Sequence, residues 1–345
     1  MSLHSEIFEQ EQILQTILDN QRGKVESIAR SISKLDLRYV FLAARGTSDN
    51  AGRYANYLWG SMNKIPVALA TPSLFTYYRM PPRLKDALVV GISQSGQSPD
   101  IVSVLEEGRR QGCATLAITN APDSPLADAA DFLIDIQAGV EAAVAATKTY
   151  TAELMAIAML SNALLEDDDG WELLSRIPGW LKSVLALDND MSRIVERYRY
   201  MDQCVVIGRG YNYATAFEWS LKLKELTYVV AEPYSSADFR HGPIAMVDMG
   251  FPVLAVVPSG KVYTDMAALL QRLQRELMAE LVVISDQNEA LALAKSPLPI
   301  PGGVPEWLTP LVSIVPAQLF AYHLTRARGF DTEKPRAIRK VTETR

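Results

Sequence analysis

Two residue types with reactive side chains are scarce, since the 345-residue sequence has only two cysteines and three histidines. Cys113 and Cys204 lie in separate segments beside apolar runs, which is typical of small core residues and allows no disulfide framework. No group of His, Asp and Cys residues has the sequence spacing of a metal site. We therefore predict a protein that needs neither a metal nor any other cofactor.

A basic face and a long apolar run are also missing. The formal net charge is −6 and no run of Lys and Arg occurs, so we expect no nucleic-acid partner. No uninterrupted apolar stretch approaches the ~18 residues of a membrane span. Glu6, Glu9 and Glu11 stand where a signal peptide would need a basic start and an apolar run. These features predict a cytoplasmic protein without a membrane partner.

A packed α/β protein is nevertheless indicated, because hydrophobic residues make up 48% of the chain and charged residues only 21%. Strand-like apolar runs alternate with helix-like runs, which is the pattern of parallel sheets covered by helices on both faces. The expected strands are residues 39–43, 66–70, 87–93, 114–119 and 131–136, then 203–207, 251–257, 280–285 and 298–301. The expected long helices are residues 48–62, 99–111, 143–165, 212–229, 264–278 and 305–328. Such sheets bind ligands beyond the carboxyl ends of their strands.

The two halves of the chain resemble each other. Residues 41–46 and 205–210 are similar strand endings followed by helices, which indicates an internal duplication. A lead-in of two helices, interrupted near Gly23, is expected before the first half, and the acidic residues 166–170 are interpreted as a solvated loop. The predicted parts are the lead-in at 1–34, domains at 35–168 and 200–328, linker helices at 169–199 and a tail at 329–345.

Residues 91–98, Gly-Ile-Ser-Gln-Ser-Gly-Gln-Ser, follow an expected strand and precede an expected helix. The first backbone N–H groups of a helix have no partner within it, and the helix dipole is positive there. Three hydroxyls and the Gln94 amide can therefore form a phosphate cradle. An ordinary turn in which Ser98 caps the helix ahead of Pro99 fits the same residues. The matching position of the second half, residues 257–260, reads Val-Pro-Ser-Gly, so we expect only the first half to bind phosphate.

Two further polar turns accompany this loop. Residues 45–50 end the first strand, and they either share the anion pocket or cap the next helix through Ser48 or Asp49. Residues 144–149 are expected to open the long helix, where Thr147 and Lys148 either line the same pocket or form a polar first turn. Neither turn matches a nucleotide-binding fingerprint.

Glu218, Lys222 and Glu225 are spaced four and three residues apart, which places them on one helix face. This face is either a solvated set of ion pairs or, because apolar residues cover much of the same helix, the setting of a general base. His241 stands in a loop beside a Gly-Pro turn, where it is either a proton shuttle or incidental. For His4 and His323 a core or surface role is expected, and the polar tail by itself indicates a frayed end.

Taken together, these stretches resemble the sugar isomerase (SIS) family. Within it they resemble the isomerase half of glucosamine-6-phosphate synthase and the stand-alone glucosamine-6-phosphate deaminases, from about Ser5 to the end of the chain. The most specific parts are Gly-Thr-Ser at 46–48, Ser-Gln-Ser-Gly at 93–96, Ala-Ala-Thr-Lys at 145–148, Leu-Lys-Leu-Lys-Glu at 221–225, His-Gly-Pro at 241–243 and the tail from Lys-Pro-Arg at 334–336 to Lys340. The resemblance implies two tandem flavodoxin-like αβα domains with parallel sheets.

The resemblance also implies a role for single residues. Glu225 would move a proton between C1 and C2 of a hexose 6-phosphate through an enediol-type intermediate, with Lys222 supporting it. His241 would assist ring opening from a neighbouring subunit, which implies a homodimer or larger homo-oligomer, and Lys340 would bring the tail near the sugar carbonyl. The phosphate ligands would be Ser48, Ser93, Gln94, Ser95 and Ser98, and the sugar contacts Thr47, Ala146 and the backbone of Val144.

The sequence differs from the synthase in three respects. It carries no glutaminase domain and no N-terminal cysteine nucleophile, so we expect no ammonia release from glutamine by that route. Arg45 stands where the synthase usually has a small residue or cysteine, and Ala146 stands where it has serine, which puts one sugar contact in doubt. The expected reaction converts glucosamine 6-phosphate to fructose 6-phosphate and ammonia, or runs the ammonia-dependent reverse. The alternatives are a fructosamine-6-phosphate deglycase and a non-catalytic sugar-phosphate sensor.

Overall fold

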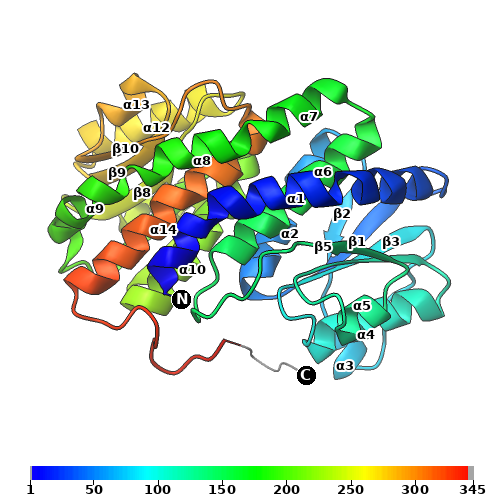
Figure 1. The fold of residues 1–345 in the computed structure, drawn as a ribbon. Coiled ribbons are helices and arrows are strands. Elements are labelled where there is room, and N and C mark those ends of the chain that lie inside the picture. Colours follow the sequence, from blue (N-terminus) through cyan, green and yellow to red (C-terminus); the bar gives the residue numbers. More distant parts are fainter. Residues whose placement is uncertain (1, 341–345) are drawn as a thin grey trace. The chain divides into compact units, whose positions relative to one another are not determined.

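A computed structural model describes residues 2–340, which form two compact units (Figure 1). The first-sheet unit contains residues 12–141, 148–176 and 339–340, and the second-sheet unit contains residues 2–11, 142–147 and 177–338. Each unit is built around one five-stranded sheet.

All strands of the first sheet run parallel, in the order β2-β1-β3-β4-β5. The strands are β1 (Tyr39–Ala43), β2 (Val67–Leu69), β3 (Ala87–Ser93), β4 (Ala114–Thr119) and β5 (Phe132–Asp135). The helices of this unit are α2 (Gly46–Ser61), α3 (Ser73–Thr76), α4 (Pro99–Arg110), α5 (Pro125–Asp128), α6 (Lys148–Leu165) and α7 (Asp168–Ser175). In Figure 1, α2 and α6 lie on one side of this sheet and α3, α4 and α5 on the other.

The second sheet repeats the first, strand for strand. Its parallel order is β7-β6-β8-β9-β10, and numbering the strands within each half gives 2-1-3-4-5 for both sheets. The strands are β6 (Gln203–Gly208), β7 (Val230–Ser235), β8 (Pro252–Val256), β9 (Glu280–Ser285) and β10 (Ser296–Pro299). This order is that of flavodoxin-like sheets, and the predicted duplication and fold class are confirmed.

Helices cover both faces of the second sheet. In Figure 1, α10 and α14 lie side by side on one face, and α12 and α13 lie on the other. The α-helices are α8 (Ile177–Leu185), α9 (Asp188–Val195), α10 (Tyr213–Thr227), α11 (Ser236–Arg240), α12 (Tyr263–Arg275), α13 (Asn288–Leu291) and α14 (Thr309–Ala327). Short 3-10 helices occur at Glu196–Tyr198, Gly210–Asn212, Pro243–Met246 and Glu306–Leu308.

The N-terminal lead-in is one helix, α1 (Leu3–Ile32), so the predicted break near Gly23 was wrong. Buried apolar side chains continue at helical spacing on both sides of this glycine, at Ile17 and Val25, both fully buried. A glycine within a helix costs about 1 kcal/mol relative to alanine. Burying a single aliphatic side chain contributes about 1.5–3 kcal/mol, so the apolar stripe outweighs the glycine.

The sequence pattern did not predict strand β7, and the loop predicted at residues 166–170 was wrong from Asp168 onward. Strand β7 contains Pro233 and lies at an edge of the sheet, where proline is tolerated because one side of the strand makes no ladder hydrogen bonds. In the acidic run, Asp167 accepts a hydrogen bond from Asp169 N–H at 3.1 Å, and α7 begins at Asp168. A capping carboxylate followed by acidic first-turn residues is a helix start.

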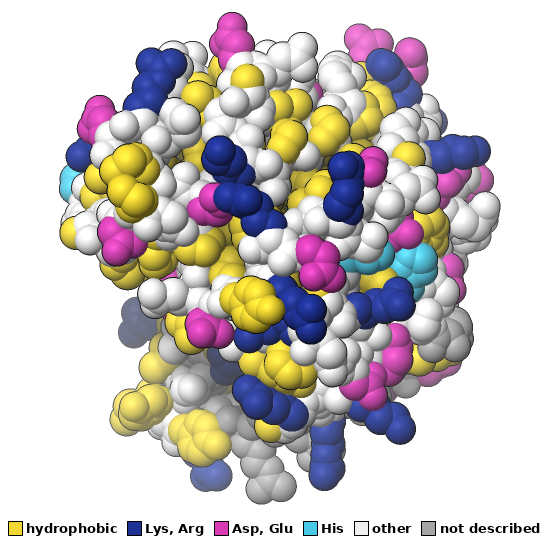
Figure 2. Space-filling model, turned by 90° about the vertical axis from the view of Figure 1, so that its left-hand side faces the viewer, with side chains coloured by type: hydrophobic (Ala, Val, Ile, Leu, Met, Phe, Trp, Pro, Cys, Tyr) yellow, Lys and Arg dark blue, Asp and Glu magenta, His cyan; other side chains and the backbone are white. Residues whose placement is uncertain are grey.

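The described surface carries charges of both signs. On the face drawn in Figure 2, Lys and Arg side chains are interspersed with Asp and Glu rather than gathered into one basic patch. None of the helices within residues 2–340 combines the length and the apolar character needed to cross a lipid bilayer.

Candidate functional site

The polar turns singled out from the sequence follow two neighbouring strands of the first sheet. Strands β1 and β3 pair in parallel, with Ala43 opposite Gly91, so the loops that follow the two strands leave the sheet at the same edge. In a 2-1-3-4-5 sheet, this pair of strands is where the strand order reverses, and ligands bind there. The turns 45–48 and 93–98 therefore lie at the edge of the first sheet where sheets of this strand order commonly bind ligands.

The first turn positions Ser48 within the opening turn of α2. Arg45 is extended and Gly46 takes a positive φ of 54°, which turns the chain into the helix. The buried Ser48 hydroxyl donates a hydrogen bond of 2.8 Å to Oε1 of the buried Glu153 on α6. To donate to a phosphate, this hydroxyl would have to turn away from Glu153, a partner that the sequence did not reveal. Thr47, beside it, is half-buried.

The serine loop holds its own shape through its hydroxyls. Ser93 Oγ accepts from Gly96 N–H at 3.2 Å, and Ser95 Oγ accepts from Gln97 N–H at 3.3 Å. Ser98 occupies the N-cap position of α4, but its side chain makes no capping hydrogen bond. The ordinary-cap alternative therefore does not account for the Ser98 hydroxyl.

An ion pair joins the two turns. Arg45 Nε lies 2.7 Å from Oδ2 of Asp100, whose side chain is 1% exposed in the first turn of α4. Asp100 was missed by the sequence reasoning, although its place directly after Pro99 at a helix start was a usable indication. This pair fixes Arg45, with its charge balanced by Asp100, at the edge where an anion is expected.

Gly96 is required by the loop geometry. Its φ is +62°, and a Cβ on it would stand 2.0 Å from Ser124 Oγ. We expect Gly96→Ala to lower the free energy of unfolding by about 1–3 kcal/mol more than Gly112→Ala does, the usual cost of overpacking. Gly112, just beyond the other end of α4, has φ +79° and no neighbouring atom within 4 Å of such a Cβ, so it bears the backbone cost alone. Urea unfolding of both variants measures the difference, and equal losses would contradict the steric argument.

The second sheet lacks an open counterpart of this loop. After β8, the Ser259 amide and hydroxyl both donate to Asp286, at 2.6 Å each. A carboxylate of the chain thus already binds the amide and hydroxyl of Ser259 in this loop.

Lys340 of the tail lies against the first-sheet unit. Its Nζ is 2.5 Å from Oε2 of Glu141, a carboxylate whose side chain is fully buried. Glu141 also accepts hydrogen bonds from the amide and hydroxyl of Thr149, at 3.2 and 2.8 Å. Glu141 and Gln94 line one surface hollow at the ends of β4 and β5. The tail is therefore not simply frayed up to Lys340, and Glu141 is a partner that the sequence reasoning missed.

The long helix begins at Lys148, so the predicted helical start at 143 was wrong. In the first-sheet unit, Glu141 takes the Thr149 amide and so caps α6. In the second-sheet unit, Glu6 accepts from the amides of Ala142 and Ala143, at 2.5 and 3.3 Å. These carboxylates hold residues 142–147 in an irregular segment, in which Val144 and Ala146 are half-buried between buried neighbours.

The second-sheet unit places the candidate base in a buried ion triad on α10. Lys222 Nζ lies 3.3 Å from Glu218 Oε1 and 2.5 Å from Glu225 Oε2. The Glu218 and Lys222 side chains are buried, whereas that of Glu225 is 24% exposed. Burial alone would lower the pKa of Lys222, but the charges of Glu218 and Glu225 outweigh it and raise that pKa. A permanently charged lysine thus anchors Glu225, and the solvated-face alternative does not fit.

His241 and residues 329–338 of the tail belong to the same unit as the α10 triad. His241 is exposed, directly after α11, with its amide bonded to Asp238 O at 3.0 Å. Tyr228, at the carboxyl end of α10, accepts a hydrogen bond from the Arg336 amide at 2.9 Å, and its ring lies 3.9 Å from the Arg336 guanidinium. The tail is therefore fastened to the helix that carries Glu225.

The structure thus gathers the predicted residues into two groups. The first-sheet unit holds the hydroxyl turns and Lys340, and the second-sheet unit holds the α10 triad, the 142–147 segment and His241. Sequence comparison matches the SIS domain to residues 36–163 and again to residues 199–327.

Curated relatives and solved structures resemble the chain along nearly its whole length. Glutamine–fructose-6-phosphate aminotransferase (isomerizing) of Gloeobacter violaceus is 36% identical over 97% of this chain, and that of Aquifex aeolicus is 32% identical over 97%. The chain spans only 57% and 56% of these proteins.

The C-terminal domain of glucosamine-fructose-6-phosphate aminotransferase from Francisella tularensis has a TM-score of 0.88 at 28% identity, covering 96% of this chain and 98% of that one. Glucosamine-6-phosphate deaminase from Thermotoga maritima covers both chains fully with a TM-score of 0.78, but at 20% identity it supports the fold alone.

Proposed function

Because the chain belongs to the SIS domain family, we propose that it is an aldose–ketose isomerase of sugar phosphates that deaminates a hexosamine 6-phosphate. Glucosamine 6-phosphate and water would give fructose 6-phosphate and ammonia, and the ammonia-dependent reverse would use the same groups. The chemistry needs an anchor for the phosphate, one carboxylate that moves a proton between C1 and C2, and a group that opens the sugar ring.

In the proposed reaction, the turns at the ends of β1 and β3 hold the phosphate through Ser48, Ser93, Gln94, Ser95 and Ser98. His241 opens the ring, and Glu225 takes the proton from C2 and returns it to C1. The resulting imine at C2 takes up water and releases ammonia. Lys340 sits near the carbonyl carbon, and Thr47, Ala146 and the Val144 backbone contact the sugar.

The observation that carries this proposal is the Glu218–Lys222–Glu225 triad. Burying an ion pair costs desolvation free energy. Here the buried Lys222 orients the Glu225 carboxylate, whose side chain remains 24% exposed to solvent. A protein that only sensed a sugar phosphate would have no need for a carboxylate prepared in this way. The triad therefore supports catalysis over the sensor alternative.

The proposal includes a homo-oligomer in which His241 acts on the substrate of a neighbouring subunit. Its exposed position after α11 suits a residue that is offered outward. A cytoplasmic setting is part of the same proposal, and Cys113 and Cys204, both free and buried, would remain thiols there.

The test is an ammonia-release assay on a panel of aminosugar 6-phosphates, with fructose 6-phosphate measured in parallel. We expect equal amounts of the two products from glucosamine 6-phosphate or a close epimer. Release of amines from fructosamine 6-phosphate adducts, in preference to ammonia from hexosamines, would instead favour a deglycase. Ala146 is the observation that favours the deglycase. The synthase has serine at this position, and the absence of the hydroxyl leaves more room for the amine part of the substrate. No turnover of any member of the panel would favour the sensor.

A further inference from the structure

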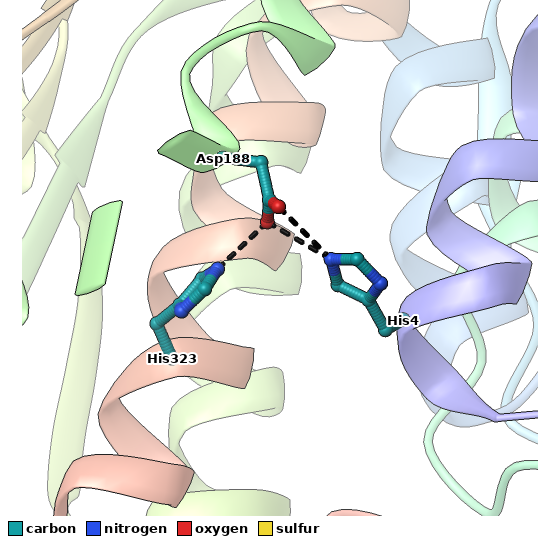
Figure 3. Close-up of side chains that lie close together, drawn as sticks. All are labelled: His4, Asp188 and His323. Atoms are coloured by element: carbon teal, nitrogen blue, oxygen red, sulfur yellow. Dashed lines mark hydrogen bonds and ion pairs between the residues drawn. The ribbon is translucent and has the colours of Figure 1, made fainter. Parts of the chain in front are cut away.

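Two of the three histidines gather on one carboxylate in the second-sheet unit (Figure 3). His4 comes from the first turn of α1, Asp188 is the first residue of α9, and His323 lies near the end of α14. His4 Nε2 is 3.0 and 3.1 Å from the two Asp188 oxygens, and His323 Nε2 is 2.7 Å from Oδ1. Both rings thus point the same nitrogen at one acidic group.

The three side chains are held in place by their surroundings. The His4 ring packs 4.7 Å from the Phe8 ring and 4.9 Å from the Tyr322 ring, measured between centroids. Tyr322 also contacts His323 edge-on at 5.0 Å. The first turn of α1 is fastened as well, because the Leu3 amide donates to Glu333 at 3.0 Å. Ligands that are already positioned lose little conformational entropy when an ion binds.

Exposure and charge also suit a cation. The side chains of His4, Asp188 and His323 are 36%, 21% and 10% exposed, so the group is open on the His4 side. Asp188 supplies the formal negative charge of the group, and its oxygens already lie within hydrogen-bond distance of both Nε2 atoms.

We infer that His4, Asp188 and His323 form a binding site for one Zn²⁺ ion, with water in the fourth position on the open side. Two imidazole nitrogens and one carboxylate oxygen are a zinc ligand set, whereas Ca²⁺ and Mg²⁺ prefer oxygen ligands throughout. Ligand atoms around tetrahedral zinc are roughly 3.3 Å apart, given bonds of about 2.0–2.1 Å. The observed His–Asp separations of 2.7–3.1 Å must widen slightly as the ion replaces the N–H···O hydrogen bonds. All three ligand atoms lie within 4.8 Å of one another, so binding also sets the separation of the two Nε2 atoms to this spacing.

Zinc binding has to move the protons that the Nε2 atoms now share with Asp188. In a neutral imidazole the proton shifts to Nδ1, and from an imidazolium it leaves to solvent. The bound ion would join α1, α9 and α14, so its role is structural and does not depend on the proposed reaction. The spacing of the ligands, at 4, 188 and 323, explains why a search for sequence-local metal motifs missed them.

The test is zinc titration of the full chain after removal of metals with EDTA. Isothermal titration calorimetry should give one Zn²⁺ per chain, and the ion should raise the thermal unfolding temperature. Asp188→Asn and His323→Ala should each weaken binding at least ~10-fold, since changes even beyond the ligands themselves cost 10–100-fold. His241→Ala is the matched control, because it removes the one histidine outside the group, and its zinc affinity should equal that of the unaltered chain.

A second variant and a second readout guard against misfolding. His4→Ala removes the most exposed ligand, so it should fold, which circular dichroism checks, and still lose the zinc-dependent rise in unfolding temperature. Co²⁺ should give a visible absorption typical of low coordination number, absent from Asp188→Asn. Absence of zinc binding to the unaltered chain, or binding that persists in His4→Ala and His323→Ala, would overturn the proposal. The three residues would then only link α1, α9 and α14 by hydrogen bonds.

Discussion

Glu225→Gln is expected to lower kcat by about 100- to 10,000-fold, the contribution typical of a general acid–base group. The amide cannot take up a proton, yet its oxygen can still accept the Lys222 hydrogen bond that now spans 2.5 Å. The fold and the phosphate turns, which belong to the other unit, should therefore be unaffected. Ammonia release and calorimetric binding of fructose 6-phosphate, measured on the same preparation, separate turnover from binding.

Glu232→Gln provides the matched control for this change. It makes the same substitution at an exposed carboxylate of the same unit, on β7, and should retain the activity of the unaltered enzyme. A sharper readout is exchange of the C1 proton of fructose 6-phosphate with D₂O, followed by NMR, which should cease in Glu225→Gln alone. Loss of fructose 6-phosphate binding together with turnover would leave the assignment of Glu225 as base without support.

Much of the fold could be predicted because short stretches of sequence indicate the individual strands and the repeat. Buried strands such as β3 read as apolar runs, and the similarity of residues 41–46 and 205–210 revealed the repeat without any tertiary information. The errors fall where a distant group overrides the local pattern. Residues 143–147 include residue types that favour helices. However, Glu6, well over a hundred residues away, accepts hydrogen bonds from the backbone amides of Ala142 and Ala143.

The residues of the candidate site could be predicted from the sequence, but the partners that hold them in place could not. Hydroxyl turns and the spacing of Lys222 and Glu225 are visible in the sequence, because each lies within one turn or one helix. The partners that fix them are not visible, since Glu153, Glu141 and Asp100 meet Ser48, Lys340 and Arg45 only after the sheet forms. Asp188 illustrates the same limit, because folding alone brings His4 and His323 to it.

Lys222→Met is expected to lower the free energy of unfolding at pH 7 by about 3–5 kcal/mol, the usual cost of removing one partner from a buried ion pair. Methionine fills much of the lysine volume, so the loss reports charge rather than a cavity. The Glu218 carboxylate, fully buried, and that of Glu225 would then lack the lysine that neutralises them. Lys224→Met is the matched control on the same helix, since Lys224 is exposed and such changes usually stay within about 0.5 kcal/mol.

The stability lost in Lys222→Met should increase as the pH rises. Without the lysine, burial would favour the neutral form of the fully buried Glu218 carboxyl, so the folded-state pKa of this group would rise above the ordinary glutamate value of about 4.3. A raised pKa adds stability below the unfolded value and removes it as pH increases, so the gap between Lys222→Met and Lys224→Met should widen from pH 4 towards pH 7. Urea unfolding across this range measures the gap. A gap that stays constant with pH would show that packing, not charge, is what Lys222 contributes.

The same variant tests whether Lys222 positions Glu225. A misplaced carboxylate slows proton transfer but leaves the phosphate turns intact, so kcat should fall while KM changes little. Adding Glu218→Gln to Lys222→Met removes one uncompensated charge and should recover part of the lost stability without restoring kcat. Recovery of stability and kcat together would mean that Lys222 acts only on the fold. A kcat that stays low in the stabilised double variant would instead assign it the task of holding Glu225 for the reaction.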